Sequence, residues 1–427
     1  MNRAKKRNLI TLASLALVFG LTLVVGFFVR GYRLDISSKT LRPTGILSAT
    51  SVPEGAQVWI NGKLKTATNQ TITLSPGQYQ VEIKKPGFTT WKKEITIKKE
   101  VVSETNARLF PIAPDLKALS FTGADKPKIS PDNTKLVYFV TSEEKNNLDE
   151  TFLATEENSE ATADAVLPEE TKIGLWLINL SEKPLGRSFQ PRILVKLPSD
   201  FDFDNTTINW SPDSRKILMI TKKNETKKDY FLIDTNQTYD FTSPPLIGEK
   251  EAGAQQILSN WRKQEALAFQ QIFEKIPERL QDYLTTKAQN LAFSPDETKI
   301  LYQAKADLDL PEKFLTKKII GASTQEESRQ LKANYWYVYD CKEDKNFLVS
   351  KDKDINLLWF PSSRHLLLIK ENSSIGIIEY DGHNQTNLYS GPFKDNFVFP
   401  FPSGKQILIL TSLNENRPAD LYSVSLE

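Results

Sequence analysis

Histidine and cysteine, which many enzymes use for proton transfer, nucleophilic attack or metal binding, are nearly absent from this chain. The sequence holds two histidines, His365 and His383, and one cysteine, Cys341, among 427 residues. Zinc sites and general bases depend heavily on histidine and cysteine, so the material for that chemistry is nearly absent. His365 lies in an expected strand, His383 in an expected turn, and Cys341 has no obvious partner base. We therefore expect no catalytic residue, no cofactor and no metal site.

Three aspartates recur in one short motif and are the most tempting catalytic candidates. Each follows a Ser-Pro pair, and an apolar strand is expected on either side. Proline cannot continue the hydrogen bonding of a strand, and aspartate can bond the backbone of a turn. Because the aspartates occupy the same place in a repeat, we interpret them as turn caps. The structural residues of these turns are Pro131, Asp132, Pro212, Asp213, Pro295 and Asp296.

The Ser-Pro-Asp motif belongs to a longer repeat that fills residues 115–427. Its copies, clear at first and weaker toward the end, begin at Ile129, Trp210, Phe293, Phe360 and Phe401. A stretch from Trp261 to Phe269 is a doubtful sixth copy. One copy is too small to bury a face alone, and a radial stack of such units with ~40 residues per blade is a β-propeller. We expect about six blades, with a strand from residues 116–121 joining the last blade.

This repeat resembles the PD40 or TolB-like propeller repeats, a WD40-like group. The resemblance implies the fold and leaves the activity open, because propellers serve as enzymes and as scaffolds alike. Long polar insertions interrupt the repeats at residues 143–170 and 305–333, and such loops commonly carry binding specificity. Residues 270–288 have the pattern of a short amphipathic helix, which either packs on the propeller or docks a partner.

Residues 46–110 alternate between short strands and turn residues. The turns fall at Pro53-Glu54-Gly55-Ala56, at Asn61-Gly62, at Ser75-Pro76-Gly77 and at Pro86-Gly87, and Asn-Gly is a strong hairpin signal. Their order and spacing resemble the PEGA domain, although Thr66 to Asn69 replace the Gly-x-Thr-Pro element usual in that family. The resemblance implies a small antiparallel β-sandwich that serves as an extracytoplasmic binding or spacer module and brings no catalytic residues.

The aromatic residues of this module allow two interpretations. A stacking platform for a glycan could be formed by Trp59, Tyr79, Phe88 and Trp91. Alternatively these rings fill the core, because large aromatics supply much of the buried area of a small sandwich. The module's lysines could likewise face an anionic wall polymer or simply form a solvated polar surface.

The N-terminus carries an apolar run at residues 9–29. These 21 residues include no charge, and as a helix they would extend ~31 Å, close to the thickness of a bilayer core. We expect an uncleaved transmembrane helix, a signal anchor; a cleaved signal peptide would be shorter and end at small residues, and a buried core helix would have a polar face. The basic residues before it are Arg3, Lys5, Lys6 and Arg7. They favour a cytoplasmic N-terminus at residues 1–8, and residues 30–45 form an expected linker.

Composition narrows the classes of function. The formal net charge is +2, so no nucleic-acid partner is expected, and a single cysteine excludes a disulfide within the chain. We expect a mainly β, bacterial cell-envelope protein that spans the cell membrane once and has an extracytoplasmic body. Its PEGA module would be a wall-binding or spacer domain, and its propeller a platform for an envelope protein or cell-wall glycan. The alternatives are a propeller enzyme, a hydrolase or lyase acting on an envelope glycan, and a body that faces the cytoplasm.

Overall fold

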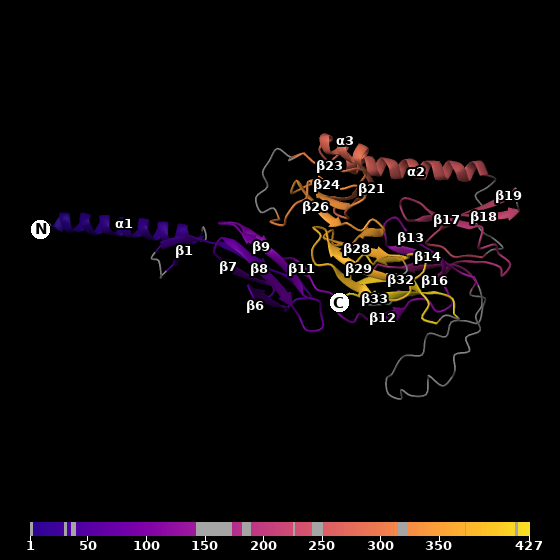
Figure 1. Ribbon diagram of the computed structural model, residues 1–427, viewed down its shortest axis with the longest axis horizontal. Helices are drawn as coiled ribbons and strands as arrows, with labels where there is room; N and C mark the ends of the chain where they lie inside the picture. The colour runs from indigo at the N-terminus through magenta and orange to yellow at the C-terminus, as the bar shows by residue number, and fades with distance from the viewer. Residues whose placement is uncertain are drawn as a thin grey trace, which may run out of the picture.

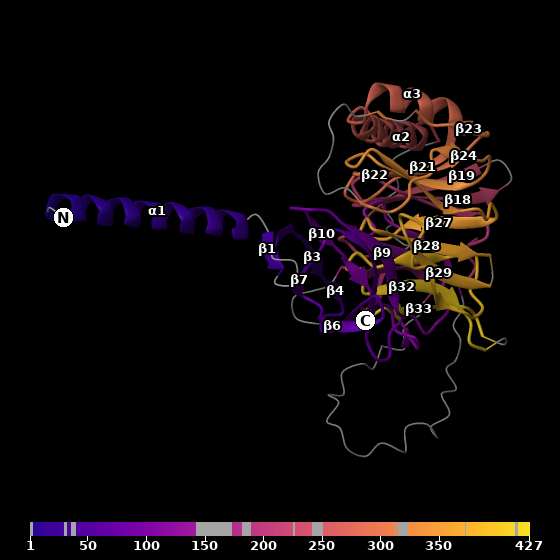
Figure 2. The same ribbon diagram turned by 60° about the vertical axis from the view of Figure 1, so that its left-hand side comes forward.

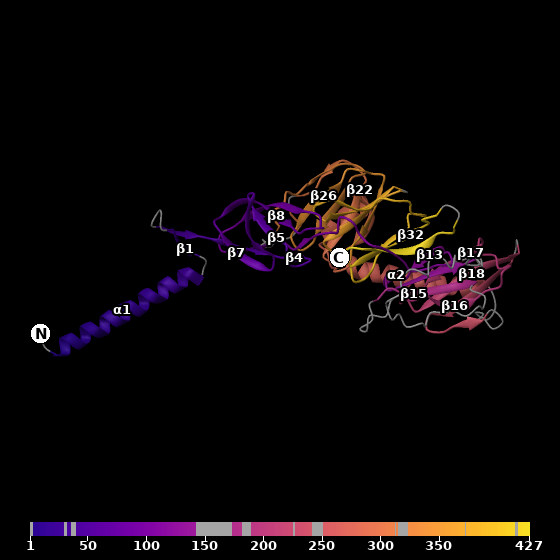
Figure 3. The ribbon, with the colours of Figure 1, turned by 90° about the horizontal axis from the view of Figure 1, so that it is seen from below.

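The structure is a computed structural model. It describes residues 3–29, 32–35, 40–141, 173–181, 189–224, 227–240, 251–311, 313–314, 323–371, 373–414 and 417–427. The expected insertion at residues 143–170 lies outside this part of the chain, and the insertion at 305–333 lies partly outside it. Helix α1, a small β-sandwich and a β-propeller follow one another along the long axis of the molecule (Figure 1, Figure 3).

Helix α1 (Arg3–Val29) projects from the body as a single rod (Figure 1). Its large apolar side chains between Leu12 and Val25 are exposed in the isolated chain. Among the helices that the structure describes, none combines the length and the apolar character needed to cross a bilayer. The transmembrane helix expected at residues 9–29 is therefore not confirmed; four of its side chains, at positions 9, 10, 27 and 28, lie outside the described set.

The segment expected as a linker contains a short antiparallel ribbon. Its strands are β1 (Tyr32–Asp35) and β2 (Thr40–Pro43), with Arg33 opposite Arg42. The sandwich begins directly after it.

Two layers of strands enclose the core of the sandwich. One layer is a four-stranded antiparallel sheet of β5 (Gln57–Ile60), β6 (Lys63–Ala67), β8 (Gly77–Lys84) and β9 (Trp91–Ile97). The other is formed by β3 (Gly45–Ala49), β4 (Ser51–Val52), β7 (Gln70–Leu74), β10 (Val102–Glu104) and β11 (Ala107–Arg108). Alternate side chains of both layers are buried between them, as the period-2 pattern predicts.

The sandwich is not antiparallel throughout, which corrects one detail of the expectation. Strands β10 and β11 run parallel to β3 and β4, because the chain returns beside its own N-terminal strands in the same direction. The hairpin between β5 and β6 turns at Asn61 and Gly62, whose φ angles are 49° and 74°. Positive φ at both central residues is what the Asn-Gly hairpin turn requires.

Five sheets, which we call blades I to V, make up the propeller. Blade I contains β13 (Asp125–Ile129), β14 (Lys135–Val140), β15 (Gly174–Asn179) and β16 (Arg192–Lys196), and β20 (Tyr239–Asp240) pairs with its edge. Blade II contains β17 (Thr206–Trp210), β18 (Lys216–Asn224) and β19 (Lys227–Asp234). Blade III contains β21 (Ala288–Phe293), β22 (Lys299–Ala304), β25 (Trp336–Asp340) and β26 (Lys345–Ser350).

The last two blades complete the array. Blade IV contains β27 (Ile355–Trp359), β28 (His365–Lys370), β29 (Ser374–Glu379) and β30 (Thr386–Tyr389). Blade V contains β31 (Val398–Pro400), β32 (Gln406–Thr411), β33 (Asp420–Ser425) and β12 (Leu116–Ala118). Strand β12 pairs antiparallel with β33, which confirms the expected joining of residues 116–121 to the last blade.

The packing between blades shows their order around the propeller. Shared apolar clusters join blade I to blade II, blade I to blade V, blade V to blade IV, and blade IV to blade III. The second strand of a blade, such as β28 or β32, is apolar over most of its length. Both of its faces are covered by neighbouring blades, as a short continuous apolar run indicates.

Two helices lie where a further blade would separate blade II from blade III. Helix α2 (Glu251–Phe273) packs on blade II, and α3 (Glu278–Lys287) packs on blade III (Figure 1, Figure 2). The doubtful sixth copy at Trp261 is part of α2, so the expectation of about six blades is wrong: the described chain forms five. This copy lacks a Ser-Pro-Asp turn, and its run of helix-forming residues outweighs the resemblance.

The amphipathic pattern at residues 270–288 corresponds to the end of α2 and to α3. Leu280 and Leu284 of α3 are buried against blade III. Of the two roles considered for this segment, packing on the propeller is the one that the structure displays.

Candidate functional site

The sandwich docks on the end of the propeller where the repeated turns lie. The turns that follow β27 and β31 hold the last copies of the repeat, and the β29–β30 turn lies at the same end because neighbouring strands are antiparallel. Arg108 Nη2 donates to Gly404 O at 2.5 Å, in the turn of blade V. The backbone N–H of Lys92 donates to Asn384 Oδ1 at 2.8 Å, in the β29–β30 turn of blade IV.

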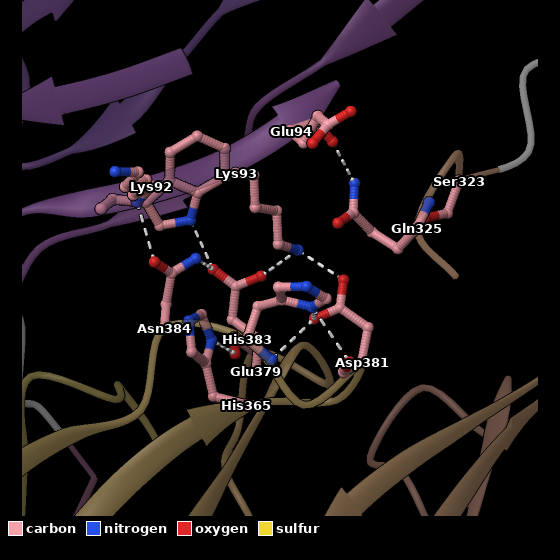
Figure 4. A network of polar contacts seen from close by, with 12 residues as sticks. Lys92, Lys93, Glu94, Ser323, Gln325, His365, Glu379, Asp381, His383 and Asn384 are labelled. Carbon is pink, nitrogen blue, oxygen red and sulfur yellow. Dashed lines mark hydrogen bonds and ion pairs between the residues drawn. The ribbon is translucent and has the colours of Figure 1, made fainter. Parts of the chain in front are cut away.

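A buried ion-pair network holds this junction together (Figure 4). The Lys93 ammonium from β9 donates to both Glu379 and Asp381 of blade IV. The Trp91 indole N–H also donates to Glu379, and Asn384 Nδ2 donates to the same carboxylate at 3.0 Å. The three charged side chains are at most 10% exposed. The network therefore joins the sandwich to blade IV through charges that water barely reaches.

The protonation states follow from burial and from this shared ammonium. Burial opposes the charge of Lys93, but Glu379 and Asp381 together raise its pKa above the usual value. Burial raises the pKa of Glu379. Burial acts in the same direction on Asp381, but the Lys93 ammonium outweighs it and lowers the pKa of Asp381 well below its usual range. One ammonium can fully compensate only one of two buried carboxylates, which gives the pair their opposite shifts.

Both histidines lie close to this network. His383 Nδ1 is 3.3 Å from Asp381 Oδ1, and that hydrogen bond raises the pKa of His383. His365 is buried between Phe110 of the sandwich and Phe360 of blade IV, with both ring contacts edge-on. Burial lowers the pKa of His365 to about 3, so the ring is neutral at physiological pH.

Comparison with known proteins identifies the domain on one side of this junction. Residues 44–112 match the PEGA domain family. This segment is a PEGA domain. No curated protein sequence matches the chain. The putative TolB from Agrobacterium tumefaciens is 13% identical over 71% of this chain and 73% of its own, with a TM-score of 0.21.

Two further solved structures match over most of the chain. TolB from Acinetobacter baumannii is 10% identical over 82% of this chain and 60% of its own length, with a TM-score of 0.21. The β-propeller domain of the Trilobed protease from Pyrococcus furiosus is 13% identical over 90% of this chain and 96% of its own, with a TM-score of 0.22. The propeller of the present chain is defined by its own five sheets.

The charged groups of the junction bind one another and hold the PEGA domain against the propeller. Lys93 binds both Glu379 and Asp381, so neither carboxylate is positioned as an unpaired acid or base. Cys341 lies elsewhere on blade III, and burial raises the pKa of its thiol to about 12, which keeps it protonated. Beside the network lies a polar cavity of about 290 Å³, whose lining includes Ser103, Glu343 and Arg364.

The four aromatic residues considered for glycan stacking do not share one face. Trp91 is 2% exposed, faces the core of the PEGA domain and bonds to Glu379. Tyr79 and Phe88 also pack against that core. Trp59 lies on the other side of the sheet, with the Lys84 ammonium 5.1 Å from its ring centroid. The structure therefore places three of the four with the core and leaves Trp59 apart from them.

The repeated turns have one geometry in all five blades. The residue two positions after the motif proline has a φ angle of 56° to 69°, at Asn133, Ser214, Glu297, Ser363 and Gly404. In each of the three clear copies the aspartate accepts a hydrogen bond from the motif serine, as from Ser211 Oγ to Asp213 at 2.6 Å, and another from a backbone N–H two residues on. Pro131, Pro212 and Pro295 thus occupy equivalent positions, and their aspartates cap turns.

Replacing Asp213 with alanine should lower the free energy of unfolding by about 1 kcal/mol, the usual worth of a lost hydrogen bond. The hydrogen bond from Ser211 lowers the pKa of Asp213. Its contribution should therefore be present above about pH 4 and fade at lower pH. Urea unfolding at pH 7 and pH 3 measures both effects. The exposed Asp204 is the control, where the same change should cost under about 0.5 kcal/mol; equal losses at the two sites would contradict the capping role.

Part of the second insertion also contacts the PEGA domain. Within residues 305–333, β23 (Leu308–Asp309) pairs with β24 (Gln330–Leu331). The segment before β24 reaches the junction, where Gln325 Nε2 donates to Glu94 O at 2.8 Å and Thr324 Oγ1 accepts from Thr96 N at 3.1 Å. This insertion, expected to be a polar loop of the kind that carries specificity, therefore belongs in part to the interface between the two domains.

One residue of β9 signals the junction in the sequence, although it belongs to no catalytic or repeat motif. Lys93 lies two residues from Trp91 and two from Ile95 in β9, so its side chain must share their face. A lysine on the apolar face of a strand is costly unless an acid meets it. The acids that meet it are Asp381, 288 residues away in the sequence, and the nearby Glu379. No local sequence pattern reveals partners at such a separation.

Proposed function

We propose that this protein is a membrane-anchored, extracytoplasmic binding or scaffold protein of the bacterial envelope. In this proposal the PEGA domain is a rigid spacer between the anchor and the propeller, with a wall-binding role open to it. The propeller is the interaction platform for an envelope protein or a cell-wall glycan, and the chain catalyses no reaction.

The observation that carries the proposal is the buried junction of Lys93 with Glu379 and Asp381. A flexible tether would need no such contact, whereas a spacer that orients its cargo does. The junction occupies the repeated-turn end of blades IV and V, so the opposite end of these blades is directed away from the PEGA domain. A platform needs such a free end.

The anchor is supported by the N-terminal segment. Residues 9–29 carry no charge, and the apolar side chains of α1 between Leu12 and Val25 find no cover from the rest of the chain that the structure describes. Exposed apolar surface of this extent is characteristic of a membrane or protein contact. The basic residues that precede it favour retention of the N-terminus in the cytoplasm.

External protease tests this arrangement. In intact spheroplasts that produce the full chain, protease should digest the propeller and PEGA domain and leave an epitope at the N-terminus protected. A variant with Arg3, Lys5, Lys6 and Arg7 changed to glutamine should reach this orientation less completely, because it lacks the positive-inside signal. Full protection of the body with an intact membrane would reject the extracytoplasmic placement.

Cross-linking and recovery of the full chain from its own envelope tests the platform. An envelope protein or glycan should be recovered with the wild type and be lost when the PEGA domain and the propeller are separated by breaking the junction. If the purified protein turns over an envelope glycan, the enzyme interpretation replaces the scaffold.

A further inference from the structure

A large cavity lies at the end of the propeller opposite to the PEGA domain. Its volume is about 530 Å³, within the range of about 300–1,000 Å³ that small-molecule sites occupy. It is formed where β21 and β27 begin, beside the β28–β29 turn and just before β31. Three consecutive blades, III, IV and V, thus contribute to one concave site.

The lining combines neutral amides with an indole and an apolar floor. The amides are Asn290, Gln303, Asn356 and Asn396, and the indole is Trp336. Leucine, isoleucine and alanine side chains of β21, β22, β27 and β28 supply the apolar part. The charged residues of the lining, Lys353, Asp354 and Glu371, are of mixed sign. The lining therefore offers no strong potential of one sign to a charged ligand, and its amides suit a neutral polar ligand.

Two polar atoms of the lining residues are buried without a hydrogen-bond partner among the described residues. They are Nε1 of Trp336, a donor on a side chain that is 6% exposed, and Oδ1 of Asn396, an acceptor. Buried polar groups are normally paired. A hydroxyl group both donates and accepts a hydrogen bond, so it has the chemistry to pair with either atom once that atom turns toward the cavity.

We propose that this cavity binds a neutral saccharide, a short segment of an envelope glycan. This inference deepens the proposed binding function and rests on it. The exposed amide of Asn356 offers a donor and an acceptor side by side, which matches the hydroxyl and acetamido groups of a sugar. The apolar residues of the lining match the C–H face of a sugar ring. Gln303 already anchors part of the lining, since its Oε1 accepts from Gln289 and Asn290 at 3.0 Å each.

Equivalent positions in two blades provide a matched pair of variants. Asn356 is the exposed second residue of β27, between buried Ile355 and Leu357, and it lines the cavity. Thr207 has the same place in β17 of blade II, between buried Thr206 and Ile208, and does not line it. Changing either exposed residue to alanine should leave folding nearly unaffected.

The test is a calorimetric titration of the full chain in a zwitterionic detergent, because sugar-headed detergents would compete. The probes are the β-1,4-linked N-acetylglucosamine tetramer, cellotetraose and a neutral tetrapeptide. We expect the oligosaccharides to bind with a Kd below about 1 mM. Asn356→Ala should weaken binding at least about tenfold, a change typical of a lost polar contact, and Thr207→Ala should leave it unchanged. Trp336→Phe, which removes only Nε1 and one ring, should also weaken binding.

Three results would overturn the inference. They are absence of oligosaccharide binding, binding that survives both Asn356→Ala and Trp336→Phe, and binding of the tetrapeptide alone, which would make the site a peptide site. Failure of the site can be told from failure of the proposed function. Saccharide binding by a body that is protected from external protease would keep the site and reject the placement. Partner recovery without saccharide binding would keep the scaffold and reject the site.

Discussion

Replacing Lys93 with alanine should destabilise the protein by roughly 3–5 kcal/mol, the usual result of removing one member of a buried charge cluster. Glu379 and Asp381 would be left facing each other behind Trp91, with no cation between them. The two carboxylates would still be shielded from water, and the Lys93 ammonium that offsets this cost would be missing. Urea unfolding of the full chain, followed by tryptophan fluorescence, measures the loss.

The neighbouring Lys92 is the matched control. It lies on the same strand, but its side chain is 55% exposed and meets Glu82 at 3.3 Å on the surface. Exposed pairs of this kind contribute ~0–1 kcal/mol, so Lys92→Ala should change stability little. If Lys93→Ala is as mild as Lys92→Ala, the junction is not held by the buried charges.

A compensating variant separates a charge effect from a loss of packing. Lys93→Met combined with Glu379→Gln and Asp381→Asn removes all three charges at similar volume. Buried ion pairs are often replaced by neutral groups without large cost, so this triple variant should recover much of the stability lost in Lys93→Ala. A triple variant as unstable as the single one would show that the shapes of these side chains, and not their charges, hold the junction.

Replacing Gly382 with alanine should also be strongly destabilising, because two separate costs meet at this residue. Its φ angle is 81°, a region that costs roughly 1–2 kcal/mol for a residue with a Cβ atom. An added Cβ would lie 2.3 Å from the carbonyl oxygen of Leu348. That oxygen belongs to the backbone of blade III and cannot move aside without distorting β26, which adds about 1–3 kcal/mol.

Gly62→Ala isolates the steric part of this cost. Gly62 has a φ angle of 74°, and no atom lies within 4 Å of a Cβ built there. Both variants carry the backbone strain, and only Gly382→Ala carries the clash. The melting temperature of Gly382→Ala should therefore be lower than that of Gly62→Ala. Limited proteolysis should cut Gly382→Ala between the PEGA domain and the propeller, because residue 382 is next to Asp381, which binds Lys93 across the junction. Equal stability of the two variants would contradict the close approach of blades III and IV.

Local features of the fold were readable in the sequence. The Ser-Pro-Asp motif sets a turn within a few residues, where serine, aspartate and backbone bond to one another. The strands that flank it carry their burial in their own pattern. For the same reason the Asn61-Gly62 hairpin and the turns of the PEGA domain lie where their residues predict, because each depends on φ angles that few residue types adopt.

The repeat pattern did not determine the number of blades. Residues 251–273 and 278–287 are helical because of their helix propensity and because α2 and α3 cover the open faces of blades II and III. The period of a repeat tells which segments form strands. It does not tell whether neighbouring blades meet or leave a gap for something else to fill.

The candidate sites were decided only by tertiary structure. Lys93 meets Asp381 across 288 residues of sequence, and the saccharide cavity gathers side chains from three blades. The sequence by itself determined the turns and the strands, because these depend on neighbours along the chain, and it showed that histidine and cysteine are scarce. Which charges are buried together, and which amides line one cavity, depends on how whole sheets pack. The pattern of one strand shows that the strand is buried, but not which distant strand covers it.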